Sequence, residues 1–307
     1  MHPILVHVPT PWGAVPVYGY GVFLGLALLA GWYLSLHLAE RDDRDASLVG
    51  DGFLVAVLAG LVGGRLAYVL VHPGTVRSFR EAFAIHGGGM VGLGSIGAGL
   101  LALLAFARYR GARPLVLAVL YAPAFAASAV LVRGGCYLFG CCFGRLLPEH
   151  APRLLAKLGT FPRVEEGGSL VGSPAYLHHL ATHPERMPLG ARASLPVHPT
   201  QLYEIVLGLA VFGAVMVVHR RRRFDGQTLT VALFLHAVVR LAVEPFRGDP
   251  GRGAFHGVST TVPLSTALAL VALVAYVVLE RTSPRRLSAE APDAPPPLPP
   301  SPGGTPS

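Results

Sequence analysis

Seven apolar stretches of around 20 residues dominate the sequence, and each is long enough to cross a lipid bilayer as an α-helix. Only 14% of the residues are charged, whereas soluble domains carry roughly 25%. A backbone in lipid must satisfy its own hydrogen bonds, which favours helices, and the residue alternation of a membrane β-barrel is absent. The sequence therefore predicts an all-α, polytopic membrane protein with seven transmembrane helices. They are expected at about 17–38, 50–71, 89–107, 115–139, 201–219, 228–246 and 259–280.

Two segments differ from this pattern. A polar, proline-rich insert at about 146–199 separates the fourth and fifth spans, and we expect it to form a cap on the outer face with a short helix near 150–158. Residues 283–307 are proline-rich and lack the apolar residues to form a core, so we expect a disordered cytoplasmic tail. Residues 1–282 then make up one membrane domain, with the insert as its periplasmic head.

Lysine and arginine in the short loops predict the orientation. Basic residues are more frequent after the first, third, fifth and seventh spans, as in the block Arg220 to Arg223. The N-terminus is therefore expected outside and the C-terminus in the cytoplasm of a bacterial plasma membrane. The N-terminal residues also lack the features of a cleaved signal peptide, so we expect the first span to be retained. The net charge of +8 fits contact with anionic lipid, and no soluble domain supports nucleic-acid binding.

Around residues 131–147 an apolar span continues into an unusual mixture of glycine, cysteine and arginine. Arg133 and Arg145 enclose all three cysteines of the chain, Cys136, Cys141 and Cys142. An ionisable group at membrane depth is costly to keep and by default marks a functional site.

Other ionisable residues are predicted at the same side of the membrane, because the helices alternate in direction. Arg65, Arg133 and Arg240 would place three guanidiniums in the outer halves of their helices. Glu244, one turn beyond Arg240, is positioned to pair with it. The remaining positive charge favours an anion, and the planar fork of arginine suits phosphate. An anion beside acyl chains is most simply a phospholipid head group.

Each of these residues also has a structural interpretation. Arg65 can extend its charge to the interface, and Arg240 with Glu244 can form a structural ion pair. His198 and the following proline fit a simple helix start. His236 fits a packed core histidine better than a catalytic one.

The cysteines do not predict a metal site. Their spacing of five and one differs from the Cys-x-x-Cys pairs of zinc sites. On a continuous helix Cys136 and Cys141 would point about 140° apart, and buried free cysteines commonly act as small apolar residues. We therefore expect no metal ligands and no cofactor.

Five motifs together resemble bacterial prolipoprotein diacylglyceryl transferases. The resemblance covers roughly residues 15–280 and preserves order and spacing. The motifs are Tyr18-Gly19, the glycine-arginine-tyrosine run Gly63 to Leu70, the signature Val132 to Arg145, His198 to Glu204, and Arg240 to Arg247.

This resemblance implies transfer of a diacylglyceryl group from phosphatidylglycerol to the lipobox cysteine thiol of a prolipoprotein. The implied partners are phosphatidylglycerol, the lipobox peptide and membrane lipid. The implied catalytic residues are Tyr18, Arg133, Arg240 and Glu244, with Glu244 orienting Arg240. The implied substrate-binding residues are Arg65, Cys136, Gly144, Arg145, His198, Gln201, Tyr203 and Arg247.

Three positions depart from the family pattern. Cys136 replaces an asparagine, Cys141 replaces a glutamate, and Leu93 replaces a histidine considered catalytic. Two alternatives therefore remain: a related enzyme with another lipid-dependent acceptor, and a non-enzymatic membrane protein that uses its cysteine cluster. A transporter is disfavoured because transporters place their sites near the midplane.

Overall fold

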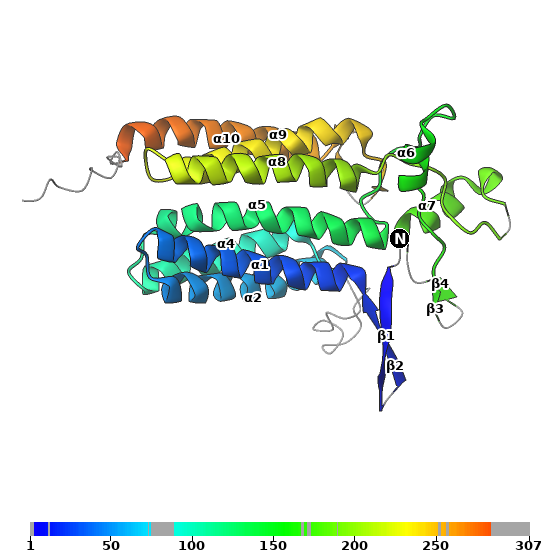
Figure 1. The fold of residues 1–307 in the computed structure, drawn as a ribbon, viewed down its shortest axis with the longest axis horizontal. Helices are drawn as coiled ribbons and strands as arrows, with labels where there is room; N and C mark the ends of the chain where they lie inside the picture. The colour runs from blue at the N-terminus through cyan, green and yellow to red at the C-terminus, as the bar shows by residue number, and fades with distance from the viewer. Residues whose placement is uncertain are drawn as a thin grey trace, which may run out of the picture.

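The computed structural model describes residues 3–11, 13–72, 74, 89–166, 169–170, 173–188, 190–250, 253–255 and 258–283. Seven long helices lie side by side in this part of the chain (Figure 1). They are α1 (Gly19–Arg41), α2 (Ala46–Val71), α4 (Gly92–Tyr109), α5 (Pro114–Phe139), α8 (Thr200–Arg221), α9 (Gln227–Val243) and α10 (Thr261–Thr282). All are long and apolar enough to cross a membrane, with α9 extended by the 3-10 turn η3 (Glu244–Phe246). The seven predicted spans are confirmed to within a few residues at each end.

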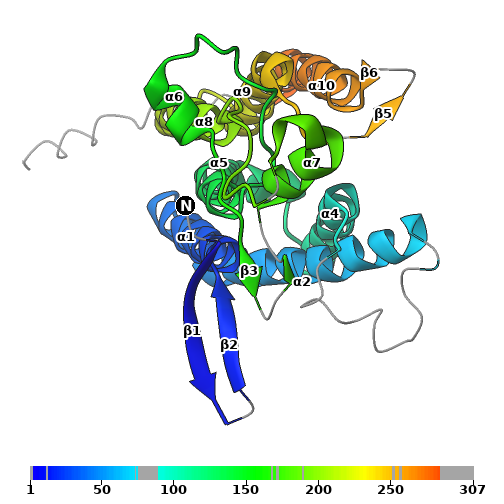
Figure 2. The same cartoon turned by 90° about the vertical axis from the view of Figure 1, so that its right-hand side faces the viewer.

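Helix α5 is the centre of the bundle. It packs against α1 on one side and against α8 and α9 on the other, while α2 pairs with α4 and α10 with α9. The end-on view shows α5 between these two groups (Figure 2). In the most apolar 18-residue stretch of α5, 39% is buried inside the protein, which is the highest share among the seven helices. A polar side chain on the face of α5 that contacts α8 and α9 therefore lies inside the bundle.

Small residues allow α2 and α4 to pack closely. A Cβ atom on Gly63 would lie 2.1 Å from the Cβ of Ala98, and one on Gly94 would lie 2.3 Å from the Cβ of Ala67. Close helix contacts in membranes commonly use such small residues. Gly63 in α2 and Gly94 near the start of α4 therefore serve helix packing, whereas Gly87 and Gly88 lie outside the described residues.

The insert between α5 and α8 folds at one end of the bundle, which we call the head end (Figure 1). It contains α6 (Arg153–Leu158), the strands β3 (Glu165–Glu166) and β4 (Ser169–Leu170), α7 (Pro174–Thr182) and the 3-10 turn η2 (Pro184–Arg186). Its core includes Phe143, Phe161, Ala175 and Val197. The short helix expected near 150–158 is confirmed as α6.

The N-terminal segment forms a hairpin, which is not among the elements expected from the sequence. Strands β1 (Ile4–Thr10) and β2 (Gly13–Tyr18) pair antiparallel and project from the bundle at the head end (Figures 1 and 2). A smaller pair, β5 (Ala254–Phe255) and β6 (Val258–Ser259), precedes α10. The proposed tail beyond Ser283 lies outside the described residues.

Candidate functional site

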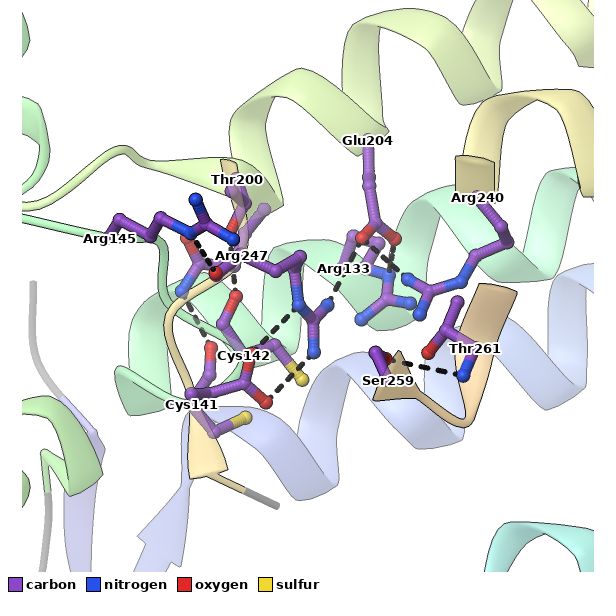
Figure 3. Close-up of polar contacts among 12 residues, drawn as sticks. Arg133, Cys141, Cys142, Arg145, Thr200, Glu204, Arg240, Arg247, Ser259 and Thr261 are labelled. Carbon is purple, nitrogen blue, oxygen red and sulfur yellow. Dashed lines mark hydrogen bonds and ion pairs between the residues drawn. The ribbon is translucent and has the colours of Figure 1, made fainter. Parts of the chain in front are cut away.

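Three arginines converge on one buried carboxylate at the head end. Glu204 of α8 is 6% exposed. Its Oε1 accepts from Nη1 of Arg240, on α9, at 2.9 Å and from Nη1 of Arg247 at 3.2 Å. Its Oε2 pairs with Nε of Arg133, on α5. Figure 3 shows these guanidiniums around the carboxylate, and we call the four residues the arginine cluster.

The residue pattern of α8 explains why Glu204 faces its neighbours. Gln201, Glu204 and Gly208 are spaced by three and four and so share one helical face. A Cβ atom on Gly208 would lie 2.9 Å from Cγ2 of Val130 on α5. This close approach brings the Glu204 carboxylate within reach of α5.

Arg247 is fixed by a second acid. It is 4% exposed, its Nη2 donates to Oδ2 of Asp249 at 2.9 Å, and its Nε lies 2.8 Å from Oδ1. Burial acts to lower the pKa of Arg247, but the carboxylates of Asp249 and Glu204 outweigh it and raise that pKa. Glu204 and Asp249 therefore hold the Arg247 guanidinium from two sides.

A cavity of about 440 Å³ lies beside the arginine cluster, between α5, α8 and α9. Its polar wall contains Arg133, Arg240 and Glu204, together with Tyr20, Cys136, Cys142 and His236. Most of the remaining wall is apolar, with Phe125, Ala126, Ala129, Val130, Val132, Val211, Ala232 and Val239. A cavity that is charged at one end and apolar elsewhere has the polarity of a phospholipid.

The apolar part of the cavity reaches the side of the bundle. Phe125 lines the cavity and is 49% exposed. It precedes Arg133 by two helical turns, which corresponds to about 12 Å along α5. The cavity therefore extends from the charged head end to a helix surface that faces the apolar surroundings.

The three cysteines lie together, which corrects the expectation from a continuous helix. Helix α5 ends at Phe139, and Gly140 adopts a left-handed conformation with φ of +79° that turns the chain back. Cys142 is also left-handed, with φ of +59°. As a result, the sulfur atoms of Cys136, Cys141 and Cys142 all lie within 4.8 Å of one another. We call these residues the thiol triad.

The start of α8 fastens the turn that carries two of these cysteines. The Thr200 hydroxyl donates to the carbonyl oxygen of Cys142 at 2.7 Å (Figure 3). The Gln201 side-chain amide donates to the carbonyl oxygen of Cys141 at 2.6 Å. Both donors are at most 1% exposed. The same helix therefore positions the thiol triad and, one turn later, the carboxylate of the arginine cluster.

Close backbone contacts connect this turn to the chain after α9. Gly144 forms an isolated β-bridge with Arg247, and a Cβ atom on Gly144 would lie 2.5 Å from the Cβ of His198. Arg145 is exposed, and its Nε donates to the carbonyl oxygen of Arg247 at 3.2 Å. Nδ1 of His198 lies 3.1 Å from the hydroxyl of Tyr203. The predicted residues Gly144, Arg145, His198 and Tyr203 thus lie around the site but do not line the cavity.

Titration of the groups outside the membrane-spanning helices follows their surroundings. Hydrogen bonds from Cys136 and Cys141 lower the pKa of the Cys142 thiol, and nearby guanidiniums act in the same direction. Burial lowers the pKa of His198. Burial, followed by neighbouring basic side chains, lowers the pKa of His179 in the insert to about 4.

Several predicted site residues lie elsewhere. Arg65 does not line the cavity; its Nη1 donates to the carbonyl oxygen of Gly89 at 3.0 Å, and its guanidinium lies over the ring of Tyr68. Tyr18 ends β2, and it is Tyr20 that lines the cavity. Glu244 is 7% exposed and begins η3.

The expectation that Glu244 orients Arg240 stays a prediction, and the structure adds a second carboxylate beside Arg240. The carboxylate that ion-pairs with Arg240 at 2.9 Å belongs to Glu204, on the neighbouring helix. Leu93, where the resemblance implies a histidine, is 67% exposed and does not line the cavity.

Four ionisable cavity residues were not predicted as site residues from the sequence: Glu204, Cys142, Tyr20 and His236. A signal existed for Glu204, because an acid close to the start of an apolar span requires a buried partner. The sequence pattern does not indicate that Cys142, rather than Cys141, lines the cavity, because both residues lie beyond the end of the helix.

The fold and the site define a class: polytopic helical membrane proteins with a mostly apolar cavity that carries arginines at one end. Sequence comparisons agree with this class and identify one family within it. The family model for prolipoprotein diacylglyceryl transferase matches residues 4–278, and the chain belongs to this family.

Relatives named phosphatidylglycerol–prolipoprotein diacylglyceryl transferase match most of the chain. The protein from Clostridium tetani is 23% identical over 260 residues, which is 85% of this chain and 92% of the relative. The protein from Mycobacteroides abscessus is 27% identical over 287 residues, covering 90% and 79%. The protein from Methylibium petroleiphilum is 28% identical over 262 residues, covering 82% and 86%.

Proposed function

We propose that this protein transfers the diacylglyceryl group of phosphatidylglycerol to the lipobox cysteine thiol of prolipoproteins, the activity named for its relatives. One observation from the structure carries the proposal. Arg133 and Arg240 share the single carboxylate of Glu204 at the polar end of a cavity that is otherwise mostly apolar.

In this proposal the lipid phosphate lies against Arg133 and Arg240. Each guanidinium has five N–H donors, and one carboxylate cannot engage both sets, so donors remain for phosphate oxygens. The acyl chains follow the apolar wall toward Phe125, where the cavity reaches the bundle surface. Glu204 fixes the guanidiniums in place before the lipid arrives, as preorganised charge requires.

The reaction is a displacement at the glyceryl carbon that carries the phosphate. The acceptor sulfur attacks this carbon, a C–S bond forms, and the C–O bond breaks with its electron pair moving to the phosphate oxygen. The thiol proton ends on the departing phosphate monoester, glycerol phosphate. Arg133 and Arg240 stabilise the negative charge that develops on this leaving group.

The location and orientation complete the proposal. The protein belongs in the bacterial inner membrane, with its head end and N-terminus at the periplasmic side and its C-terminus in the cytoplasm. Arginines after α4 and α8, at the end opposite the insert, support this orientation by the charge rule for short loops.

Transfer activity provides the test. Purified full-length protein is incubated in detergent with phosphatidylglycerol and a lipobox peptide, and the mass of the peptide is followed. We expect a gain equal to one diacylglyceryl group, which is lost when the peptide cysteine is replaced by serine. Unchanged peptide mass, together with failure to complement a strain depleted of its own transferase, would favour the alternative of a different acceptor.

A further inference from the structure

The thiol triad has the composition of a metal site at the wall of the lipid cavity. Its three sulfur atoms lie within 4.8 Å of one another, and these are all the cysteines of the chain. Cys136 is 4% exposed, while Cys141 and Cys142 are partly exposed. Cys136 and Cys142 line the cavity, so a metal held between them would be reachable from it.

The sulfur-to-sulfur spacing is close to that of a tetrahedral zinc site. With Zn–S bonds of about 2.3 Å, ligand sulfurs lie about 3.8 Å apart, so the triad needs to contract by no more than about 1 Å. Three thiolates and Zn²⁺ carry a net charge of about −1. The guanidiniums of Arg133 and Arg247 lie close enough to Cys142 to stabilise negative charge on its sulfur.

The backbone holds the ligands in an unusual way. Adjacent residues such as Cys141 and Cys142 converge here because Gly140 reverses the chain and Cys142 is left-handed. Non-glycine residues rarely adopt this conformation, and it costs about 1–3 kcal/mol. Hydrogen bonds from Thr200 and Gln201 to the two cysteine carbonyls oppose relaxation of the turn.

We infer that Cys136, Cys141 and Cys142 bind one Zn²⁺ ion whose open fourth position takes the acceptor thiol; this role rests on the function proposed above. Catalytic zinc sites have three protein ligands and one open position. A thiol that coordinates such an ion gives up its proton to water, which supplies the thiolate for attack on the glyceryl carbon, and the departing phosphate monoester takes up a proton from water in turn. The triad would thereby activate the thiol in a chain that has leucine at the family histidine position, Leu93.

Metal binding is tested first, without reference to activity. The full-length protein is purified under reducing conditions, freed of metal with a chelator, and titrated with Zn²⁺ and with Co²⁺. We expect one bound ion per chain and, with Co²⁺, a sulfur-to-metal charge-transfer band. Cys136→Ser, Cys141→Ser and Cys142→Ser should each weaken binding by at least about tenfold.

A matched control addresses adventitious binding by histidine. His178 and His183 lie on and just after α7, on either side of the buried His179. The double variant His178→Gln, His183→Gln should bind Zn²⁺ and Co²⁺ as the unmodified protein does. Binding that disappears in this variant and persists in the cysteine variants would overturn the proposed site, as would a disulfide among the three cysteines in protein isolated without reductant.

Transfer activity separates the two proposals. Removal of metal should lower diacylglyceryl transfer about 100-fold or more, and added Zn²⁺ should restore it. Full activity in the metal-free protein would overturn the zinc role and leave the proposed function standing. A bound ion with the thiolate signature, but no transfer to the lipobox peptide, would keep the zinc site and reject the proposed function.

Discussion

Nη1 of Arg240 lies 2.9 Å from Oε1 of Glu204, and this contact ties α9 to α8 at the polar wall of the cavity. The same carboxylate pairs with Arg133 of α5, so one side chain fixes the relative position of the three cavity-forming helices. Glu204 therefore has a structural role and an electrostatic role at once.

Replacement of the Glu204 carboxylate should weaken the packing of the three helices and remove the acid that their arginines share. Glu204→Gln keeps the shape but leaves three guanidiniums without their shared acid. We expect a loss of about 3–5 kcal/mol in stability, because buried charges without a partner are strongly destabilising. Thermal unfolding in detergent measures this loss. Glu185→Gln, on an exposed carboxylate of the insert, is the control and should unfold as the original protein does.

The forked geometry of arginine can be tested without removing charge. Arg240→Lys keeps a cation but provides no planar pair of donors for phosphate. We expect transfer from phosphatidylglycerol to fall on the order of 100-fold, as for loss of one preorganised donor. The exposed Arg220, substituted as Arg220→Lys, should retain full activity. Equal activity of the two variants would contradict a phosphate contact at Arg240.

Close backbone approach predicts the effect of one added methyl group. Gly144→Ala would place Cβ 2.5 Å from Cβ and the carbonyl oxygen of His198 and 2.6 Å from the carbonyl oxygen of Phe246. We expect a loss of about 1–3 kcal/mol in stability, as for overpacking. In contrast, Gly213→Ala has no neighbouring atom within 4 Å and should be neutral or slightly stabilising. Melting temperatures of the two variants provide the comparison.

A buried histidine in the insert predicts a pH effect. His179 is 2% exposed, and its pKa is lowered from 6.5 to about 4. Below pH 6.5 the unfolded chain takes up this proton first, so stability should fall between about pH 6.5 and pH 4, by up to about 3 kcal/mol.

The variant His179→Gln removes this proton uptake. Its melting temperature should therefore decline less between pH 7.5 and pH 4.5 than that of the original protein. The exposed His150, substituted as His150→Gln, should follow the original curve. If all three curves coincide, the histidine does not stay neutral in the folded insert.

Orientation predicts which sites reagents can reach from outside the cell. Arg186→Cys adds a thiol to the insert, and Arg223→Cys adds one after α8; both original residues are exposed. A membrane-impermeant maleimide should label the first variant in spheroplasts and the second only after lysis. Labelling of the Arg223→Cys variant in spheroplasts, with the Arg186→Cys variant labelled only after lysis, would contradict the proposed orientation.

The sequence was sufficient for the helices and for part of the site. Span length and apolarity are local properties, so all seven helices were predicted close to their observed bounds. Arg133 and Arg240 were selected because charge at membrane depth needs a reason, and both line the cavity.

The features of the site that could not be predicted depend on contacts between residues far apart in the sequence or on a reversal of the chain. Arg240 has one acid, Glu244, a turn away on its own helix, but its ion pair is with Glu204, which is 36 positions away in sequence. The thiol triad depends on the chain reversal at Gly140, and periodicity alone extended the helix through it. The β1–β2 hairpin has a local signal in its alternating valines, Val6, Val8, Val15 and Val17, but the adjoining apolar span gives a stronger one.

The half-exposed position of Phe125 gives the cavity a side entrance below the charged end. A phospholipid that enters there need not pass through water at any stage. Its supply is then set by its share of the surrounding bilayer, and dilution with an inert lipid should slow turnover even when the total amount of substrate is held constant.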